Sequence, residues 1–264
     1  MLTKRLIACF DIVAGRVTKA IQFQDNIDVA PADELASKMY ETGIDELIFY
    51  DITASSEKRR IDIETVKKVA KRVFIPFTVG GGIKNLDDMY EALKAGAEKI
   101  SIDSMAVRNP QIIADGAKAF GSQCIVLSTQ VKRTSDRLEF PSGYEVYIDG
   151  ARTATGLDAI EWLKRGQELG AGEICLNSID CDGTLGGYDM ELMKAAEAVV
   201  TVPLIASGGA GKPEHLKEVF SETDTHAAII SSMLYSPRVA RNYSVCELKE
   251  YLTKNGIDVR PFSG

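Results

Sequence analysis

The sequence predicts a (β/α)8 TIM barrel built from two duplicated (β/α)4 halves. Residues 41–52 match residues 168–179, and residues 76–82 match residues 203–209. The two matches share one offset of 127 positions, from 41 to 168 and from 76 to 203. Chance similarity would not keep its register over about forty residues, so half of the chain has been duplicated.

Eight short apolar runs predict the strands of this barrel. They cover residues 5–12, 46–52, 76–79, 99–102, 123–131, 172–177, 203–206 and 227–231. Between them, apolar residues lie three and four apart, as in 63–73 and 86–94, which is typical of amphipathic helices. A half-repeat of four βα units closes naturally into a barrel, so we prefer it to a doubly wound open sheet. We expect one domain over residues 1–264, since such barrels often have about 250 residues.

Two insertions follow strand C-termini, the face where barrels place their chemistry. Residues 15–31 are expected to form a long loop. Residues 131–155 contain two alternating runs around Pro141-Ser142-Gly143 and Asp149-Gly150, which predicts a β-hairpin. Long loops at this face are more often binding elements or lids than neutral insertions.

Composition excludes several classes of protein. A formal net charge of −7 with no run of Lys or Arg argues against a nucleic-acid surface. No apolar run reaches the roughly 18 residues that span a bilayer, and no signal-peptide core precedes the first strand, so we expect a cytoplasmic protein.

Cysteine and histidine offer little material for metal, cofactor or histidine chemistry. The five cysteines are an odd number without CxxC spacing and are expected to be buried reduced thiols: Cys9, Cys124, Cys175, Cys181 and Cys246. His215 and His226 lie in a predicted helix and at the entry to the last strand, where packing or surface roles are expected. We therefore expect no metal site and no cofactor.

Two glycine clusters in equivalent positions of the two halves predict two phosphate sites. Residues 78–83 and 206–212 each end a strand and are expected to open a helix, so bare backbone N–H groups can close on an anion. Glycines also make tight βα turns, but their symmetric recurrence favours a bis-phosphate ligand. Serines follow each cluster at the next strand end, at Ser104 and at Ser231 and Ser232.

Carboxylates at strand ends inside a barrel mouth are candidates for general acid–base catalysis. Asp11 and Asp51 end the first two strands, and Asp180 and Asp182 follow the sixth. Asp180 and Asp182 fit helix caps or turn formers equally well. Asp11 fits that role less well, because no helix follows it immediately.

Four charged residues begin strands: Arg5, Glu46, Lys99 and Glu173. Two positive and two negative side chains pointing inward would close the bottom of the barrel as a ring, because unpaired buried charge is costly. Strand starts lie near solvent, however, so the sequence alone favours surface charges.

Taken together, these segments resemble the cyclase subunit of imidazole glycerol phosphate synthase in histidine biosynthesis. The resemblance covers nearly the whole chain. It is carried by residues 4–11 (KRLIACFD), 15–19 (GRVTK), 51–55 (DITAS), 77–83 (FTVGGGI), 120–123 (FGSQ), 172–174 (GEI), 178–184 (SIDCDGT), 205–211 (IASGGAG) and 247–252 (ELKEYL).

The resemblance implies an ammonia-dependent lyase that works with a separate glutaminase subunit docked on the bottom of the barrel. Ammonia would cross the barrel interior and attack a bis-phosphorylated ribulosyl aminoimidazole carboxamide. The products would be imidazole glycerol phosphate and aminoimidazole carboxamide ribotide. Arg5, Glu46, Lys99 and Glu173 would then form the ammonia gate.

The resemblance also assigns roles in the barrel mouth. Asp11 is expected to be one catalytic acid–base group, and Lys19 a loop contact to substrate phosphate. Substrate contacts are expected from Lys19, Gly81, Gly82, Asp103, Ser104, Asp182, Gly208, Gly209, Ser231 and Ser232.

This sequence departs from the family at the barrel mouth. Gln130 stands where the family has its second catalytic aspartate, and an amide exchanges no proton at neutral pH, so a loss of about 10²- to 10⁴-fold in turnover is expected. Asp103 replaces an asparagine beside a phosphate and would repel it unless protonated. Ala20 replaces a glycine, and residues 30–32 (APA) replace Gly-Asp-Pro, which is expected to stiffen or re-aim the first loop.

Three other functions remain open from the sequence. A divergent paralogue could keep the conduit and the glutaminase-docking base but aminate another substrate. A non-catalytic subunit could only activate a glutaminase. A related phosphoribosyl isomerase would need two acid–base aspartates, and Gln130 counts against it.

Overall fold

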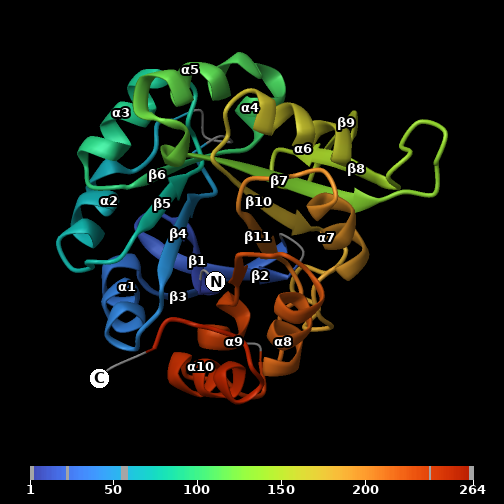
Figure 1. Cartoon of the computed structure of the whole chain (residues 1–264). Helices are drawn as coiled ribbons and strands as arrows, with labels where there is room; N and C mark the ends of the chain where they lie inside the picture. Colours follow the sequence, from blue (N-terminus) through green and yellow to red (C-terminus); the bar gives the residue numbers. More distant parts are fainter. Residues whose placement is uncertain (1–2, 22–23, 55–58, 238, 262–264) are drawn as a thin grey trace.

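The structure is a computed structural model that describes residues 3–21, 24–54, 59–237 and 239–261. Eight parallel strands pair in chain order, and the last pairs with the first to close a barrel (Figure 1). They are β1 (Arg5–Val13), β4 (Glu46–Asp51), β5 (Phe77–Gly80), β6 (Lys99–Ile102), β7 (Ile125–Arg133), β10 (Glu173–Ser178), β11 (Leu204–Ser207) and β12 (Ala227–Ile229). The predicted (β/α)8 barrel is confirmed.

Helices surround the strands, as Figure 1 shows. The long ones are α1 (Ala32–Glu41), α2 (Ile63–Ala70), α3 (Leu86–Lys94), α5 (Gln111–Phe120), α6 (Ala159–Glu168), α7 (Met190–Glu197), α8 (Pro213–Glu222) and α10 (Val245–Lys254). Two short helices, α4 (Ser104–Arg108) and α9 (Ser231–Tyr235), follow β6 and β12, and a 3₁₀ turn, η1 (Ser122–Cys124), precedes β7. α4 and α9 thus occupy equivalent positions in the two halves of the barrel.

The core has two layers because each strand buries both faces. One apolar cluster lies between strands and helices. A smaller one, which includes Ile7, Ile48, Val126 and Ile205, fills the inside of the barrel. The strand order places β7 four strands round from β1, so the side chains at their C-terminal ends face each other across the barrel mouth.

At the majority of strand ends, the observed bound differs from the predicted one by one or two residues. The largest difference is β7, which runs to Arg133 because its end pairs with the inserted strand that follows. α3 has the predicted bounds, whereas α2 stops at Ala70, since the N–H groups of Arg72 and Val73 turn back to the Val69 carbonyl.

The prediction of a long loop over residues 15–31 is wrong. This segment forms an antiparallel hairpin, β2 (Arg16–Ile21) and β3 (Gln24–Pro31), whose first strand pairs with the projecting end of β1. Pairing with that free edge satisfies backbone groups that an isolated loop would expose. The side chain of Ala20 lies outside the described residues. Residues 30–32 join β3 to α1.

The hairpin predicted over residues 131–155 is confirmed. β7, β8 (Tyr144–Ile148) and β9 (Thr153–Asp158) form an antiparallel extension that projects from the barrel (Figure 1). Its turn places Asp149, Gly150 and Ala151 at positive φ. The turn is tied back to the barrel because the Asp149 N–H donates to Ser104 Oγ at 2.9 Å.

The five cysteines are free thiols, but the prediction that all are buried is wrong: Cys175 is buried and the other four are partly exposed. His215 packs within α8 and its Nδ1 accepts a hydrogen bond from the Gly211 N–H, in agreement with a packing role. Among the described helices, none is long and apolar enough to cross a membrane.

Candidate active site

A cavity of about 750 Å³ opens at the C-terminal ends of the barrel strands. This volume lies within the range of sites that enclose a small-molecule ligand. Of the residues predicted for catalysis or substrate binding, all except Asp180 line it: Asp11, Lys19, Asp51, Gly81, Gly82, Asp103, Ser104, Gln130, Asp182, Gly208, Gly209, Ser231 and Ser232. The fold thus brings together residues that are far apart in the chain.

Asp11 lies at the end of β1 beside Lys19 of the first hairpin. The Lys19 Nζ is 3.9 Å from Asp11 Oδ2, and the Asp11 side chain keeps 29% of its exposure. Burial raises the pKa of Asp11 above its ordinary value, and the charge of Lys19 opposes this. Burial also raises the pKa of Asp182 above its ordinary value, and the charge of Lys19 again opposes this. Burial therefore favours the acid forms of Asp11 and Asp182, whereas the charge of Lys19 favours their carboxylate forms.

A chain of polar side chains runs along the ends of β7, β10 and β11. Ser207 Oγ donates to Asn177 Oδ1 at 2.7 Å, and Asn177 Nδ2 donates to Gln130 Oε1 at 2.8 Å. Gln130 in turn lies close enough to Asp103 to favour its charged form. Asn177 and Ser207 were not predicted. Their positions at the ends of β10 and β11, level with Gln130, could have indicated that they line the barrel mouth.

The pKa of Asp103 is raised to about 7, mainly by burial. The hydrogen bond from Gln130 and the charge of Arg108 lower it, and the charge of Asp149 raises it. Asp103 is therefore divided between its acid and carboxylate forms near neutral pH. The repulsion from phosphate expected from its sequence position is absent while it is protonated.

Replacing Asp103 by asparagine is expected to stabilise the protein above neutral pH and to change little in acid. A carboxyl whose pKa is raised on folding contributes stability that is complete below its unfolded pKa and is lost as the pH rises through its folded pKa, about 7. The gain in unfolding free energy at about pH 8 should be about 2 to 4 kcal/mol. Urea unfolding of both proteins at about pH 4 and pH 8 measures it. An equal effect at the two pH values would contradict this account of the carboxyl.

Asp51 is not the free acid–base candidate that its sequence position predicted. Its oxygens accept from Arg59 Nη1 at 2.5 Å and Nη2 at 2.6 Å, and also from the N–H groups of Ala54 and Asp62. This pairing anchors the loop that follows β4. Asp180 also has a structural role, since it accepts from the Arg133 N–H at 2.8 Å and caps no helix.

The four predicted glycines form two narrow loops after β5 and β11. All have positive φ: 83° at Gly81, 73° at Gly82, 88° at Gly208 and 104° at Gly209. A Cβ atom would lie 2.3 Å from the Asp51 carbonyl oxygen at Gly81, and 1.9 Å from the Gly187 carbonyl oxygen at Gly209. Both loops therefore require glycine. Residues 206–212 open a helix as predicted, because Lys212 is the cap of α8, whereas residues 78–83 end before Asn85, the cap of α3.

A Gly209→Ala substitution is expected to displace the loop and weaken binding of an anionic ligand. Strain at positive φ adds about 1 kcal/mol or more, and the contact with the Gly187 carbonyl must be relieved by backbone movement. Phosphate protection against thermal unfolding and the KM for a bis-phosphate substrate measure this. Gly186→Ala is the matched control, since a Cβ there lies 3.4 Å from Thr184 Oγ1. Equal ligand protection in the two variants would contradict the prediction.

Basic side chains are divided between the two sides of the cavity. Among the described residues that line it, Lys84, Arg108 and Arg152 accompany Gly81 and Gly82, whereas Lys19 approaches from the hairpin after β1. Arg108 also pairs with Asp149, with 2.6 Å between Nη2 and Oδ2. Arg108 and Arg152 were not predicted, although the predicted turn at Asp149-Gly150 marked where Arg152 would lie.

Arg5, Glu46, Lys99 and Glu173 form a closed ring at the opposite end of the barrel. Arg5 pairs with Glu46 at 2.5 Å and with Glu173, while Lys99 pairs with Glu46 at 2.5 Å and with Glu173 at 2.8 Å. The glutamate side chains are 2% and 6% exposed, and those of Arg5 and Lys99 are 27% and 18% exposed. The expectation of separate surface charges is wrong, because each cation bridges both buried glutamates.

The barrel interior joins this ring to the cavity. Ile7, Ile48, Val126 and Ile205 lie in the apolar cluster between them. Tyr50 packs against the same cluster and lines the cavity, where its hydroxyl lies 3.1 Å from Ser101 Oγ and 3.2 Å from Ser128 Oγ. Desolvation in such an interior has a large free-energy cost for a charged solute and a much smaller one for a small neutral molecule.

This architecture defines a class: a (β/α)8 barrel with carboxyl groups and two glycine loops in its mouth and an ion-paired ring at its base. The chain belongs to the histidine biosynthesis protein family, whose profile matches residues 5–240. It is 52% identical over 260 residues to the imidazole glycerol phosphate synthase subunit HisF of Desulfosudis oleivorans, covering 98% of this chain and 99% of the relative. It is 51% identical to the protein of that name from Syntrophobacter fumaroxidans and 48% identical to that of Oleidesulfovibrio alaskensis, each over 98% of this chain and 99% of the relative.

Proposed function

We infer that this chain is the cyclase subunit of imidazole glycerol phosphate synthase, a lyase of histidine biosynthesis. It uses ammonia to convert a bis-phosphorylated ribulosyl aminoimidazole carboxamide into imidazole glycerol phosphate and aminoimidazole carboxamide ribotide. The observation that carries this conclusion is that one barrel of this family has a substrate-sized mouth at one end and an ion-paired ring at the other.

The two glycine loops hold the two phosphates of the substrate at opposite sides of the mouth. Backbone N–H groups at Gly81, Gly82, Gly208 and Gly209 are available to anions because no Cβ covers them. Arg108 and Lys84 add positive charge on the side of Gly81, and Lys19 adds it near Asp11. Holding both ends fixes the reacting centre between the walls that carry Asp11 and Gln130, which lowers the entropic cost of reaction.

Asp11 acts as an acid–base group on the substrate. Its raised pKa allows the carboxyl to hold a proton more readily than an exposed aspartate, while Lys19 stabilises the carboxylate once the proton has left. This combination suits a group that both accepts and returns protons within one turnover.

A glutaminase subunit docks on the face that carries the ring. Arg5 and Lys99 are partly exposed there, so a partner can reach them, whereas Glu46 and Glu173 are buried behind them. Ammonia released by the partner passes the ring when one cation moves aside and then crosses the apolar interior as the neutral molecule. Charged ammonium is excluded by its desolvation cost.

Genetic complementation tests the proposed function. The gene, expressed with the glutaminase gene of its own organism, should restore growth without histidine to a strain that lacks the cyclase subunit. The Asp11→Asn gene should fail while producing equal amounts of protein. Growth failure with well-folded native protein would favour a paralogue that aminates another substrate or a non-catalytic glutaminase activator.

A further inference from the structure

Five carboxylates line the cavity within the described residues: Asp11, Asp51, Asp103, Asp149 and Asp182. Proton transfer to a substrate requires a carboxyl group whose oxygens are not already bound by hydrogen bonds to a cation, a condition that Asp11 meets because Lys19 Nζ lies 3.9 Å away. Asp51 is bound by both terminal nitrogens of Arg59, and Asp149 by Arg108. Asp11 and Asp182 remain, on the side of Lys19, and Asp103 remains on the far side.

Asp103 has no structural role that would explain a partly buried carboxyl. It stands at the N-cap position of α4, yet its side chain makes no capping hydrogen bond. Within the described part of the chain, no basic side chain forms an ion pair with it. The neighbouring side chain that stabilises its charged form is Gln130, from the adjacent strand β7.

Gln130 is oriented by the side chains beyond it. The Ser207 hydroxyl donates to Asn177 Oδ1, which turns Asn177 Nδ2 toward Gln130 Oε1. An amide whose oxygen accepts from one side presents its NH2 group to the other. Gln130 therefore turns its NH2 group toward Asp103, whose charged form it stabilises.

The position of Asp103 complements that of Asp11. β6, which Asp103 follows, lies three strands round the barrel from β1, and both side chains line the same cavity. A substrate held by the two glycine loops would have one carboxyl group on each side of its reacting centre.

We propose that Asp103 is the second catalytic carboxyl of this barrel and that Gln130 is the residue that positions it. The inference rests on the proposed function. It replaces the expectation that Asp103 contacts phosphate and that Gln130 leaves the site with a single acid–base group.

The proton balance of the first chemical step fits this pair. Attack of ammonia on the ketone carbon of the ribulosyl group forms a C–N bond and breaks the C=O π bond. Asp103, in its acid form, gives a proton to the carbonyl oxygen, and the Asp11 carboxylate takes one from the nitrogen. The product is a neutral carbinolamine. Loss of water then needs a proton on the hydroxyl oxygen and the removal of one from the nitrogen. Asp11, now in its acid form, gives the first and the Asp103 carboxylate takes the second, so an imine and water form and both carboxyl groups return to their starting forms.

The pKa of Asp103, raised to about 7 by burial, allows the acid form to be present at neutral pH. The charged groups that act on it from neighbouring elements are Arg108 of α4 and Asp149 of the β8–β9 turn, and these pair with each other. Their opposite effects leave burial as the main cause.

Two single substitutions and their combination test the proposal with ammonium salts and the bis-phosphate substrate. Asp103→Asn should lower kcat by about 10²- to 10³-fold with little change in KM. Gln130→Asp alone should not raise kcat, because two adjacent carboxyl groups share one proton and shift each other's titration. The double variant Asp103→Asn/Gln130→Asp should recover kcat to within about tenfold of the native protein. In this variant the carboxyl lies at position 130 and the amide at position 103, so the two neighbouring groups have exchanged places.

Asp87→Asn, an exposed aspartate in the first turn of α3, is the matched control and should leave kcat unchanged. Native turnover retained in Asp103→Asn, or a double variant no better than the single one, would overturn the proposal while the proposed function stands. Absence of imidazole product from the native protein itself would overturn both. The expected gain in stability of Asp103→Asn above neutral pH excludes misfolding as the reason for lost activity.

Discussion

An Asp11→Asn variant should lose about 10²- to 10⁴-fold in ammonia-dependent turnover, the largest effect expected of any single substitution in this barrel. Asparagine keeps the shape of the side chain but neither accepts nor returns a proton. Lys19, whose Nζ lies 3.9 Å from the carboxylate, would lose its counter-charge without losing access to substrate phosphate. We therefore expect kcat to fall far more than the affinity for the bis-phosphate changes.

Steady-state kinetics with saturating ammonium measures the loss in kcat, and calorimetric titration with imidazole glycerol phosphate measures binding. Asp87→Asn, exposed on α3, serves as the control for removal of one negative charge. If kcat of the variant stays within about threefold of the native value, Asp11 is not a catalytic group.

A Lys99→Met variant should destabilise the protein by about 3 kcal/mol and uncouple it from a glutaminase. Lys99 makes half of the ion pairs in the ring, and its loss leaves Glu46 and Glu173, which are 2% and 6% exposed, to share Arg5 alone. Ammonium added to the solution can reach the mouth directly, whereas under the proposed function ammonia from a docked partner passes the ring. Glutamine-dependent turnover should therefore fall more than ammonium-dependent turnover.

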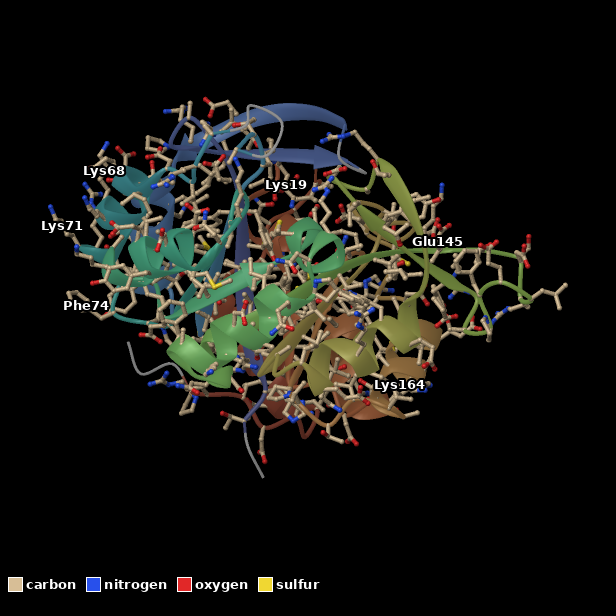
Figure 2. All side chains as sticks on the ribbon, turned by 90° about the horizontal axis from the view of Figure 1, so that it is seen from above. Lys19, Lys68, Lys71, Phe74, Glu145 and Lys164 are labelled. Carbon is tan, nitrogen blue, oxygen red and sulfur yellow. The ribbon has the colours of Figure 1, made fainter. Side chains whose placement is uncertain are left out.

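The matched control is Lys164→Met, which removes an exposed ion pair with Glu161 on α6 and lies at the outside of the molecule (Figure 2). Such surface pairs contribute about 0 to 1 kcal/mol, so this variant should match the native protein in both assays. Equal losses of glutamine- and ammonium-dependent turnover in Lys99→Met would contradict a role of the ring in ammonia passage.

The barrel could be predicted because duplication and strand spacing are properties of the sequence itself. The offset of 127 positions fixed the equivalence of the two glycine loops, and both loops were found in the same cavity. The ring was harder to foresee, since strand starts usually lie near solvent. Only closure of the barrel brings Arg5 within hydrogen-bond distance of both Glu46 and Glu173.

The parts that sequence did not predict depend on contacts between distant segments. The hairpin over residues 15–31 forms because β1 projects beyond the barrel and offers a free edge, which local alternation does not reveal. Asp51 appeared available for catalysis until Arg59, on the loop after β4, was seen to bind it. The relation between Asp103 and Gln130 likewise appears only when β6 and β7 lie side by side.

The most direct test of the proposed function is to incubate the purified chain with ammonium and the bis-phosphorylated ribulosyl aminoimidazole carboxamide and to measure both products. We expect imidazole glycerol phosphate and aminoimidazole carboxamide ribotide to appear in equal amounts, without a partner protein. A substrate that stays intact at every enzyme concentration, although it binds the barrel, would contradict the assignment as a cyclase.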